Sequence, residues 1–232
     1  MNFENELISG VLIKRYKRFF VDIKLKNKII TAHCPNPGSM FNLLKEGNKV
    51  WFTESNNIKR KLKYTLQIIE VNNVKFCINT HITNKIIQES LGNKAINDLN
   101  KYDLVKSEKK FGTNTRFDFL LENTKSNKKA YLEVKSVSLS RKKNHAEFPD
   151  AVTERGKKHL ENLILAKQKG YESYLIFLIQ IENCKTFSIA SDIDPVYFKV
   201  FKDALKKNVN VLCYDCKFYN KGIEINKRIE IL

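Results

Sequence analysis

Residues 115–137 read TRFDFLLENTKSNKKAYLEVKSV, and this stretch predicts a β-hairpin. Apolar and polar side chains alternate in its first arm, a polar turn follows, and apolar residues resume in its second arm. If the turn is centred between Lys125 and Ser126, Asp118 lies opposite Glu133. Because successive side chains of a strand point to opposite faces, Glu133 and Lys135 share one face. The hairpin therefore brings two carboxylates and one lysine together.

This trio indicates metal-dependent chemistry. Two facing carboxylates in an apolar hairpin repel each other, and their burial is costly unless a cation pairs with them. Mg²⁺ takes oxygen ligands from one or two carboxylates, water and substrate phosphate. We therefore predict Asp118 and Glu133 as catalytic ligands of Mg²⁺ or Mn²⁺, with Lys135 holding an attacking water or offsetting phosphoryl charge. The same residues also fit an ordinary solvated strand face, so the flanking chain has to decide.

The spacing of these residues resembles the PD-(D/E)xK nuclease motif. Asp118 is followed by a gap of fourteen residues and then by Glu133-x-Lys135. Phe117 stands where the name of the motif places Pro, a position beside the chemistry rather than in it. In that nuclease fold a carboxylate from the helix before the hairpin often joins the metal site. The resemblance implies Glu89 as that further ligand; the alternative is an ordinary exposed glutamate on a helix.

The chain is strongly basic. Its 42 Lys and Arg residues exceed its 25 Asp and Glu residues, which gives a formal charge of +17 and favours a polyanionic partner. The first 83 residues are denser in positive charge, with 14 basic and 6 acidic side chains. Lys, Asn and Ile are abundant throughout, so the codon composition of an AT-rich genome is an alternative source of the charge.

Two further features bear on the compartment. No run of eighteen apolar residues occurs, and the first residues lack the order of a signal peptide, so we expect a soluble, cytoplasmic protein without a membrane partner. The five cysteines are expected to be reduced thiols. Cys213 and Cys216 have the spacing of half a zinc site, but no second pair or nearby His completes it.

The region from residue 6 to residue 79 predicts short strands joined by turns, which favours a small barrel of the OB-fold type. A string of basic and aromatic residues lies between the first two strands. Proteins hold single strands of nucleic acid with positive charges along the phosphate backbone and aromatic rings stacked on the bases. We therefore predict a nucleic-acid contact at Lys14, Arg15, Tyr16, Lys17 and Arg18; the alternative is a solvated loop with Phe19 in the core.

The string HCPNPGSM at 33–40 predicts a rigid turn at a strand end, either structural or a shaped contact surface. His33 and Cys34 are adjacent on a strand and point to opposite faces, which argues against a nucleophile pair.

The second part predicts a helix over 84–97, a strand over 103–111, the central hairpin and a basic loop over 140–149. Thr153 is expected to cap a helix that ends at Gly170, followed by a buried strand over 174–181. A helix over 195–207 and strands over 209–216 and 222–231 complete the chain. The candidate phosphate contacts in this part are Arg116, Arg141, Lys142, Arg155 and Lys158, with solvated surface charge as the alternative.

Several strings together resemble the sugar fermentation stimulation protein A (SfsA) family. They are RYKRF at 15–19, HCPNPGSM at 33–40, GNKVW at 47–51, FDFLL at 117–121, LEVKSV at 132–137 and FPDAVTERG at 148–156. The resemblance implies an OB-like N-terminal domain, here 1–83, and a PD-(D/E)xK-type α/β domain with a mixed sheet flanked by helices, here 84–232. It also implies DNA binding with little sequence preference, and the name of the family implies a link to sugar metabolism.

The leading hypothesis is therefore that the protein binds DNA, single strands included, and has a nuclease site that depends on Mg²⁺ or Mn²⁺. One alternative is a regulatory DNA-binding protein that never cuts. A second is a protein whose true ligand is a small metabolite, which predicts weak DNA affinity with little salt dependence.

Overall fold

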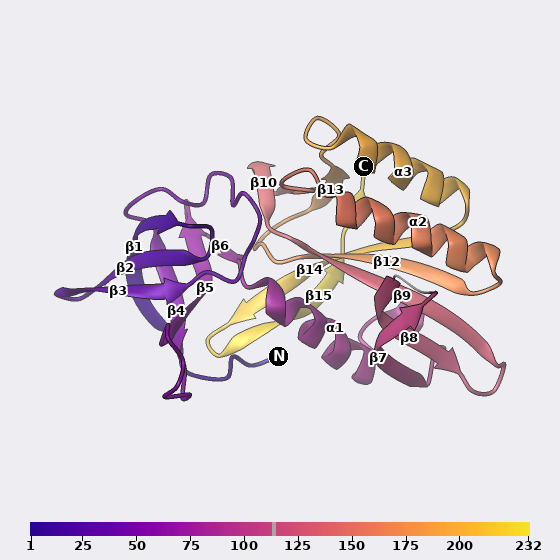
Figure 1. The fold of residues 1–232 in the computed structure, drawn as a ribbon, viewed down its shortest axis with the longest axis horizontal. Coiled ribbons are helices and arrows are strands. Elements are labelled where there is room, and N and C mark those ends of the chain that lie inside the picture. The colour runs from indigo at the N-terminus through magenta and orange to yellow at the C-terminus, as the bar shows by residue number, and fades with distance from the viewer. Residues whose placement is uncertain (113–114) are drawn as a thin grey trace.

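The computed structural model describes residues 1–112 and 115–232, which form a barrel followed by a layered α/β part (Figure 1). The barrel strands are β1 (Ile8–Tyr16), β2 (Phe20–Leu25), β3 (Lys28–His33), β4 (Lys49–Glu54) and β5 (Tyr64–Val71), with β6 (Val74–Cys77) beside β5. Their order is β3-β2-β1-β4-β5-β6, and a parallel pairing of β3 with β5 closes the barrel. This closure confirms the predicted OB-fold.

The alternation of side chains along the strands explains the barrel. Val21 and Ile23 of β2 are buried inside it, whereas the alternate residues Asp22 and Lys24 face outward. The basic string is placed differently from the prediction, because its first three residues belong to β1. Only Lys17, Arg18 and Phe19 form the turn, where Lys17 and Arg18 have positive φ.

The second part is built on a mixed six-stranded sheet of order β15-β14-β12-β9-β8-β7. Its central strand β12 (Glu172–Ile179) is buried on both faces, as predicted, and lies parallel to both neighbours. The other strands are β7 (Leu104–Phe111), β8 (Thr115–Asn123), β9 (Lys128–Val137), β14 (Asn210–Tyr219) and β15 (Gly222–Arg228).

Helices cover both faces of this sheet. α1 (Thr83–Gly92) lies on one face, and α2 (Glu154–Gln168) and α3 (Pro195–Lys206) lie on the other (Figure 1). Thr153 caps α2 as predicted, because its Oγ1 accepts a hydrogen bond from the Gly156 N–H at 3.0 Å. This layered arrangement is the predicted α/β fold.

Two expectations for this part were wrong. The helix predicted over 84–97 ends at Gly92, and a turn with positive φ at Lys94 leads to a short 3₁₀ helix, Asn97–Leu99. A second 3₁₀ helix, Thr80–Ile82, precedes α1. The loop predicted over 140–149 is instead a hairpin of β10 (Leu139–Lys142) and β11 (His145–Phe148). It belongs to a separate sheet with β13 (Thr186–Ile189) and β16 (Glu230–Ile231).

Backbone contacts join the barrel to the second part. The Cys77 N–H donates to the Gln180 carbonyl at 2.8 Å, and the Glu182 N–H donates to the Lys75 carbonyl at 3.0 Å. The string at 33–40 also lies at this junction, where Ser39 Oγ donates to the Asp150 carbonyl at 2.9 Å. A Cβ on Gly38 would lie 2.1 Å from Asp150 Oδ2, so a larger residue would force the Asp150 carboxylate to move. The string is therefore a structural contact between the two parts.

The two cysteines with zinc-like spacing are buried free thiols. Cys213 packs into the core beneath α2 and α3, whereas Cys216 packs into the core beneath α1. The spacing therefore does not form half a zinc site. None of the helices in the described ranges is long and apolar enough to cross a membrane.

Candidate metal centre

The central hairpin has the predicted register. The pairs run from Phe119 opposite Leu132 to Asn123 opposite Lys128, which places Asp118 level with Glu133. Beyond Phe119 the two strands separate, and the Val134 N–H donates to Asp118 Oδ2 at 2.7 Å instead of to a backbone carbonyl. The other oxygen of Asp118 accepts from Asn84 Nδ2, also at 2.7 Å. Asp118 is therefore held between β9 and the first turn of α1.

Glu133 is held from the other side of the site. Its side chain is only 3% exposed, and Oε1 pairs with Lys135 Nζ at 2.7 Å and with His159 Nδ1 from α2. The second oxygen, Oε2, is buried and has no hydrogen-bond partner within the described chain. A buried carboxylate oxygen without a partner is costly, and a cation would satisfy it. The donor set at this position therefore fits an oxygen-preferring divalent ion.

The electrostatics of the two carboxylates differ. Burial and the nearby charge of Glu133 raise the pKa of Asp118 to about 6. Burial also acts to raise the pKa of Glu133, but the positive charge of Lys135 and the hydrogen bond with His159 outweigh it and hold the pKa below its usual value. Asp118 is therefore the carboxylate whose ionised form has least compensation from the protein, which is the situation that a bound cation relieves.

The helix that precedes the hairpin contributes a different residue from the one expected. Glu89 pairs with the amino group of Met1 at 3.0 Å, whereas Asn84 is the α1 residue that contacts Asp118. Among the residues described, no group of three or more His, Cys, Asp or Glu side chains is arranged to hold a metal. The protein therefore offers two carboxylates here, and Glu89 lies outside the site.

The sequence predicted Arg155 and Lys158 of α2 as phosphate contacts, but it predicted no contact for His159. One signal was present, since Arg155 and His159 are four residues apart and share a helix face. The structure shows that contact, with Arg155 Nε 3.4 Å from His159 Nε2. His159 could not have been linked to Glu133 from the sequence, because only the packing of α2 on β9 brings them together.

The predicted nucleic-acid contacts fall into two groups. Arg15 donates to the carbonyls of Arg18, Asn36 and Gly38, and Arg141 pairs with Glu147 and Asp192. These two guanidinium groups therefore hold loops in place. Exposed side chains remain at Lys14, Lys17, Arg18, Arg116, Lys142, Arg155 and Lys158.

Tyr16 is half-buried and stacks on Phe20 with ring centroids 5.6 Å apart, and Lys14 Nζ lies 5.7 Å from its ring. Arg116 Nη1 lies 3.8 Å from Glu108 at the surface.

Comparisons with known proteins identify the family. A model of the SfsA N-terminal OB domain matches residues 13–78, and a model of the sugar fermentation stimulation protein RE domain matches residues 81–222. The chain belongs to the SfsA family. The SfsA relatives include the sugar fermentation stimulation protein homologs of Pelagibacter ubique, 51% identical over 100% of this chain and 99% of that protein, and of Pseudoalteromonas atlantica, 42% identical over the whole of both chains.

A solved structure of SfsA from Pyrococcus furiosus in complex with Ca²⁺ has the same fold. The TM-score is 0.89 at 22% sequence identity, and the match covers 100% of this chain and 98% of that one. The two-domain fold is therefore that of SfsA.

Proposed function

We propose that this SfsA-family protein binds DNA and cleaves phosphodiester bonds with a divalent cation, Mg²⁺ or Mn²⁺, held by Asp118 and Glu133. The observation that carries the proposal is the buried Glu133 Oε2, which has no partner within residues 1–112 and 115–232 and lies near the partly buried carboxylate of Asp118. The Pyrococcus furiosus SfsA, solved in complex with Ca²⁺, supports divalent-ion binding by a protein of this fold.

The residues around the carboxylates have separate tasks in this proposal. A bound divalent ion would supply Lewis-acid polarisation and a nucleophilic water. Asn84 and the Val134 N–H orient Asp118, and His159 orients Glu133. The Lys135 ammonium, 2.7 Å from Glu133 Oε1, is placed to orient the attacking water or to offset negative charge that develops on the phosphoryl group. Arg155, exposed in the first turn of α2, is positioned to contact a substrate phosphate.

A regulatory DNA-binding role without cleavage is favoured by one observation. Lys135 and His159 both contact Glu133 Oε1, so the Glu133 charge is already compensated by two side chains from the protein. If those contacts persist, the carboxylate is part of a buried ion pair rather than a ligand. The two functions differ in whether the protein takes up a divalent ion.

The experiment compares metal uptake, cleavage and DNA binding in the same preparations. Calorimetry with Mg²⁺ and Mn²⁺ measures uptake, and labelled single- and double-stranded DNA reports cleavage. Asp118→Asn is expected to lower cleavage by at least about 10²-fold, since even outer-shell changes at metal sites cost 10–100-fold. The matched control is Glu161→Gln, which removes an exposed carboxylate of α2.

DNA binding in EDTA is expected to be the same in both variants. Cleavage that survives Asp118→Asn in a clean preparation would overturn the assignment. Absence of metal uptake by the unmodified protein would favour the regulatory alternative.

A further inference from the structure

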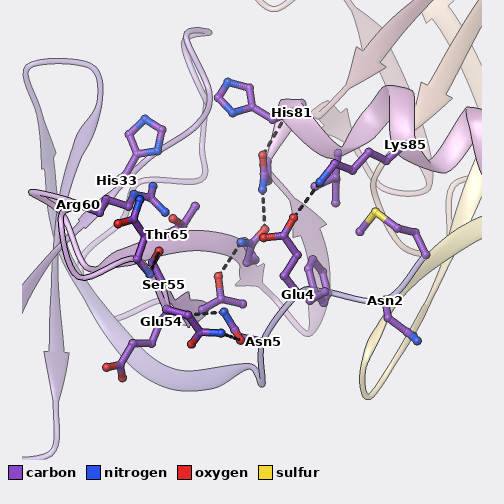
Figure 2. Close-up of a pocket in the computed structure, with 18 residues that line it drawn as sticks. Asn2, Glu4, Asn5, His33, Glu54, Ser55, Arg60, Thr65, His81 and Lys85 are labelled. Carbon is purple, nitrogen blue, oxygen red and sulfur yellow. Dashed lines mark hydrogen bonds and ion pairs between the residues drawn. The ribbon is translucent and has the colours of Figure 1, made fainter. Parts of the chain in front are cut away.

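A cleft of about 600 Å³ lies between the barrel and the beginning of the second part (Figure 2). It is lined by residues 1–5, by the ends of β3 to β5, by the β4–β5 connection and by residues around the start of α1. Among the described residues, Asp118, Glu133 and Lys135 do not line this cleft. The cleft is therefore a site separate from the candidate metal centre.

The walls of the cleft combine positive charge with hydrogen-bonding groups. The positive charges are Arg60 on the barrel side and Lys85 on the side of α1, and the imidazole rings of His33 and His81 lie on the same two sides (Figure 2). Two carboxylates also line it, but each has a partner: Glu4 pairs with Lys85 at 2.9 Å and Glu54 with Lys63 at 2.5 Å. Glu4 is 83% exposed, so a phosphate can displace it from Lys85 at little cost.

The inner wall is a row of uncharged polar side chains. Gln67 Nε2 donates to Thr53 Oγ1 at 2.9 Å, and Asn79 Nδ2 donates to Gln67 Oε1 at 2.7 Å. These amides are buried and fixed by each other, and each amide oxygen retains capacity to accept a second hydrogen bond. Fixed amide and hydroxyl groups of this kind recognise the edges of unpaired bases.

Three rings extend from the β1–β2 turn to the cleft. Phe19 stacks on His33 with centroids 6.4 Å apart, and the His33 ring lies 6.2 Å from that of His81. The Phe19 side chain is 41% exposed. Exposed rings in series are the stacking surface that single strands use, and stacking tolerates any base.

The loops beside the cleft are those that OB-folds use for ligands. In this fold the β1–β2 and β4–β5 connections bind oligonucleotides or oligosaccharides. The β4–β5 connection, residues 55–63, carries the basic cluster Lys59, Arg60, Lys61 and Lys63. Because the rim and the chain as a whole are basic, the charge favours a polyanion over a neutral oligosaccharide.

The start of α1 links the cleft to the metal centre. Asn84 contacts Asp118 at the metal centre, and the next residue, Lys85, lines the cleft. The cleft and the candidate metal centre therefore meet at the first turn of α1.

We propose that the cleft binds an unpaired segment of nucleic acid, with a base against His33, His81 and the amide row and with backbone phosphates on Arg60 and Lys85. This inference rests on the proposed function and deepens it, because it makes single-stranded nucleic acid the substrate class. The unpaired strand would pass from the barrel loops through the cleft, and its adjoining phosphodiester would reach Asp118 and Glu133.

The test measures binding in EDTA, so that no cleavage is required. The probes are a fluorescein-labelled oligothymidylate of about 15 nucleotides, near the upper site size of one OB-fold, and a blunt duplex of equal length. Arg60→Gln is compared with Lys61→Gln, which removes the same charge from the same connection at a residue that does not line the cleft. Thermal unfolding verifies that both variants fold.

Arg60→Gln is expected to weaken oligothymidylate binding about fivefold and to reduce the magnitude of the log–log salt slope by about 0.7, the value for one phosphate contact on a single strand. Lys61→Gln should change affinity less than about twofold, as expected for a charge outside the contact. The double variant His33→Ala, His81→Ala is expected to lose about tenfold in affinity, or about 1.4 kcal/mol, with little change for the duplex.

Equal losses for Arg60→Gln and Lys61→Gln, equal losses for duplex and single strand, or competition by a neutral oligosaccharide would each overturn the inference. Failure of the proposed function looks different. In that case the selective loss of single-strand binding persists, while metal uptake and cleavage are absent from the unmodified protein.

Discussion

The carboxylate of Asp118 accepts a hydrogen bond from the backbone N–H of Val134, 2.7 Å away, at the point where β8 and β9 stop pairing. This contact takes the place of a backbone hydrogen bond between the two strands. It fixes the Asp118 carboxylate against Val134, the residue that follows Glu133. Because Asn84 holds the second oxygen, the carboxylate is oriented by the protein before any ion binds. Such preorganisation is what a metal ligand requires from its surroundings.

The first prediction concerns the stability of the metal-free protein. Asp118→Asn is expected to raise the free energy of unfolding at neutral pH in EDTA by about 2 kcal/mol, because a pKa raised to about 6 means that the fold disfavours the ionised carboxylate. Ca²⁺ should raise the melting temperature of the unmodified protein and leave that of the variant unchanged. Denaturant unfolding with and without Ca²⁺ measures both effects. A variant less stable than the parent in EDTA would contradict the electrostatic account.

The second prediction concerns His159. His159→Asn removes the partner that orients Glu133 Oε1. The expected loss in Ca²⁺ affinity is about tenfold, the lower end of the range for outer-shell partners of metal ligands. Calorimetry checks it, with Lys158→Gln as the neighbouring exposed control on α2. Equal affinities for the two variants would mean that His159 has no part in the site.

The third prediction concerns acid stability and Arg141. Its hydrogen bonds lower the pKa of Glu147 and lower that of Asp192 to about 2. A carboxylate with a lowered folded-state pKa stabilises the protein above its unfolded pKa, and this stabilisation is lost as the pH falls through the folded value. Arg141→Gln is expected to cost about 2 kcal/mol at neutral pH, because it leaves the buried Glu147 without its partner.

The difference between Arg141→Gln and the parent should shrink as the pH falls from about 5 towards 2. Chemical denaturation across this range measures it. A difference independent of pH would show that Arg141 acts through packing and not through its ion pairs.

The fourth prediction separates structural from ligand-binding charges in the basic string. Arg15→Lys keeps the charge but cannot reproduce three hydrogen bonds to the carbonyls of Arg18, Asn36 and Gly38, so it should destabilise the protein by about 1–2 kcal/mol. Lys17→Gln, at an exposed turn, should leave stability within about 0.5 kcal/mol and weaken DNA binding. Denaturant unfolding and fluorescence-anisotropy titrations with DNA measure both effects in both variants. Weaker DNA binding with unchanged stability in Arg15→Lys would show that Arg15 contacts DNA.

The sequence by itself specified the local elements of this protein. Alternating side chains predicted the barrel strands and the central hairpin, and the polar turn at Lys125 and Ser126 set its register, because a shift of one residue would expose the apolar face. The continuous apolar run in β12 and the Thr153 cap of α2 were also predicted from the sequence, because each depends only on residues adjacent in the chain.

Tertiary structure decided which side chains meet across elements. Glu89 was assigned to the site from the resemblance to a nuclease motif, but the rotation of α1 on the sheet presents Asn84 to Asp118 instead. His159 reaches Glu133 only because α2 packs on β9, and the cleft exists only because the barrel lies against the start of α1. Periodicity fixes the face on which a residue lies within its own element. The contacts between faces are set by long-range packing, which no local pattern encodes.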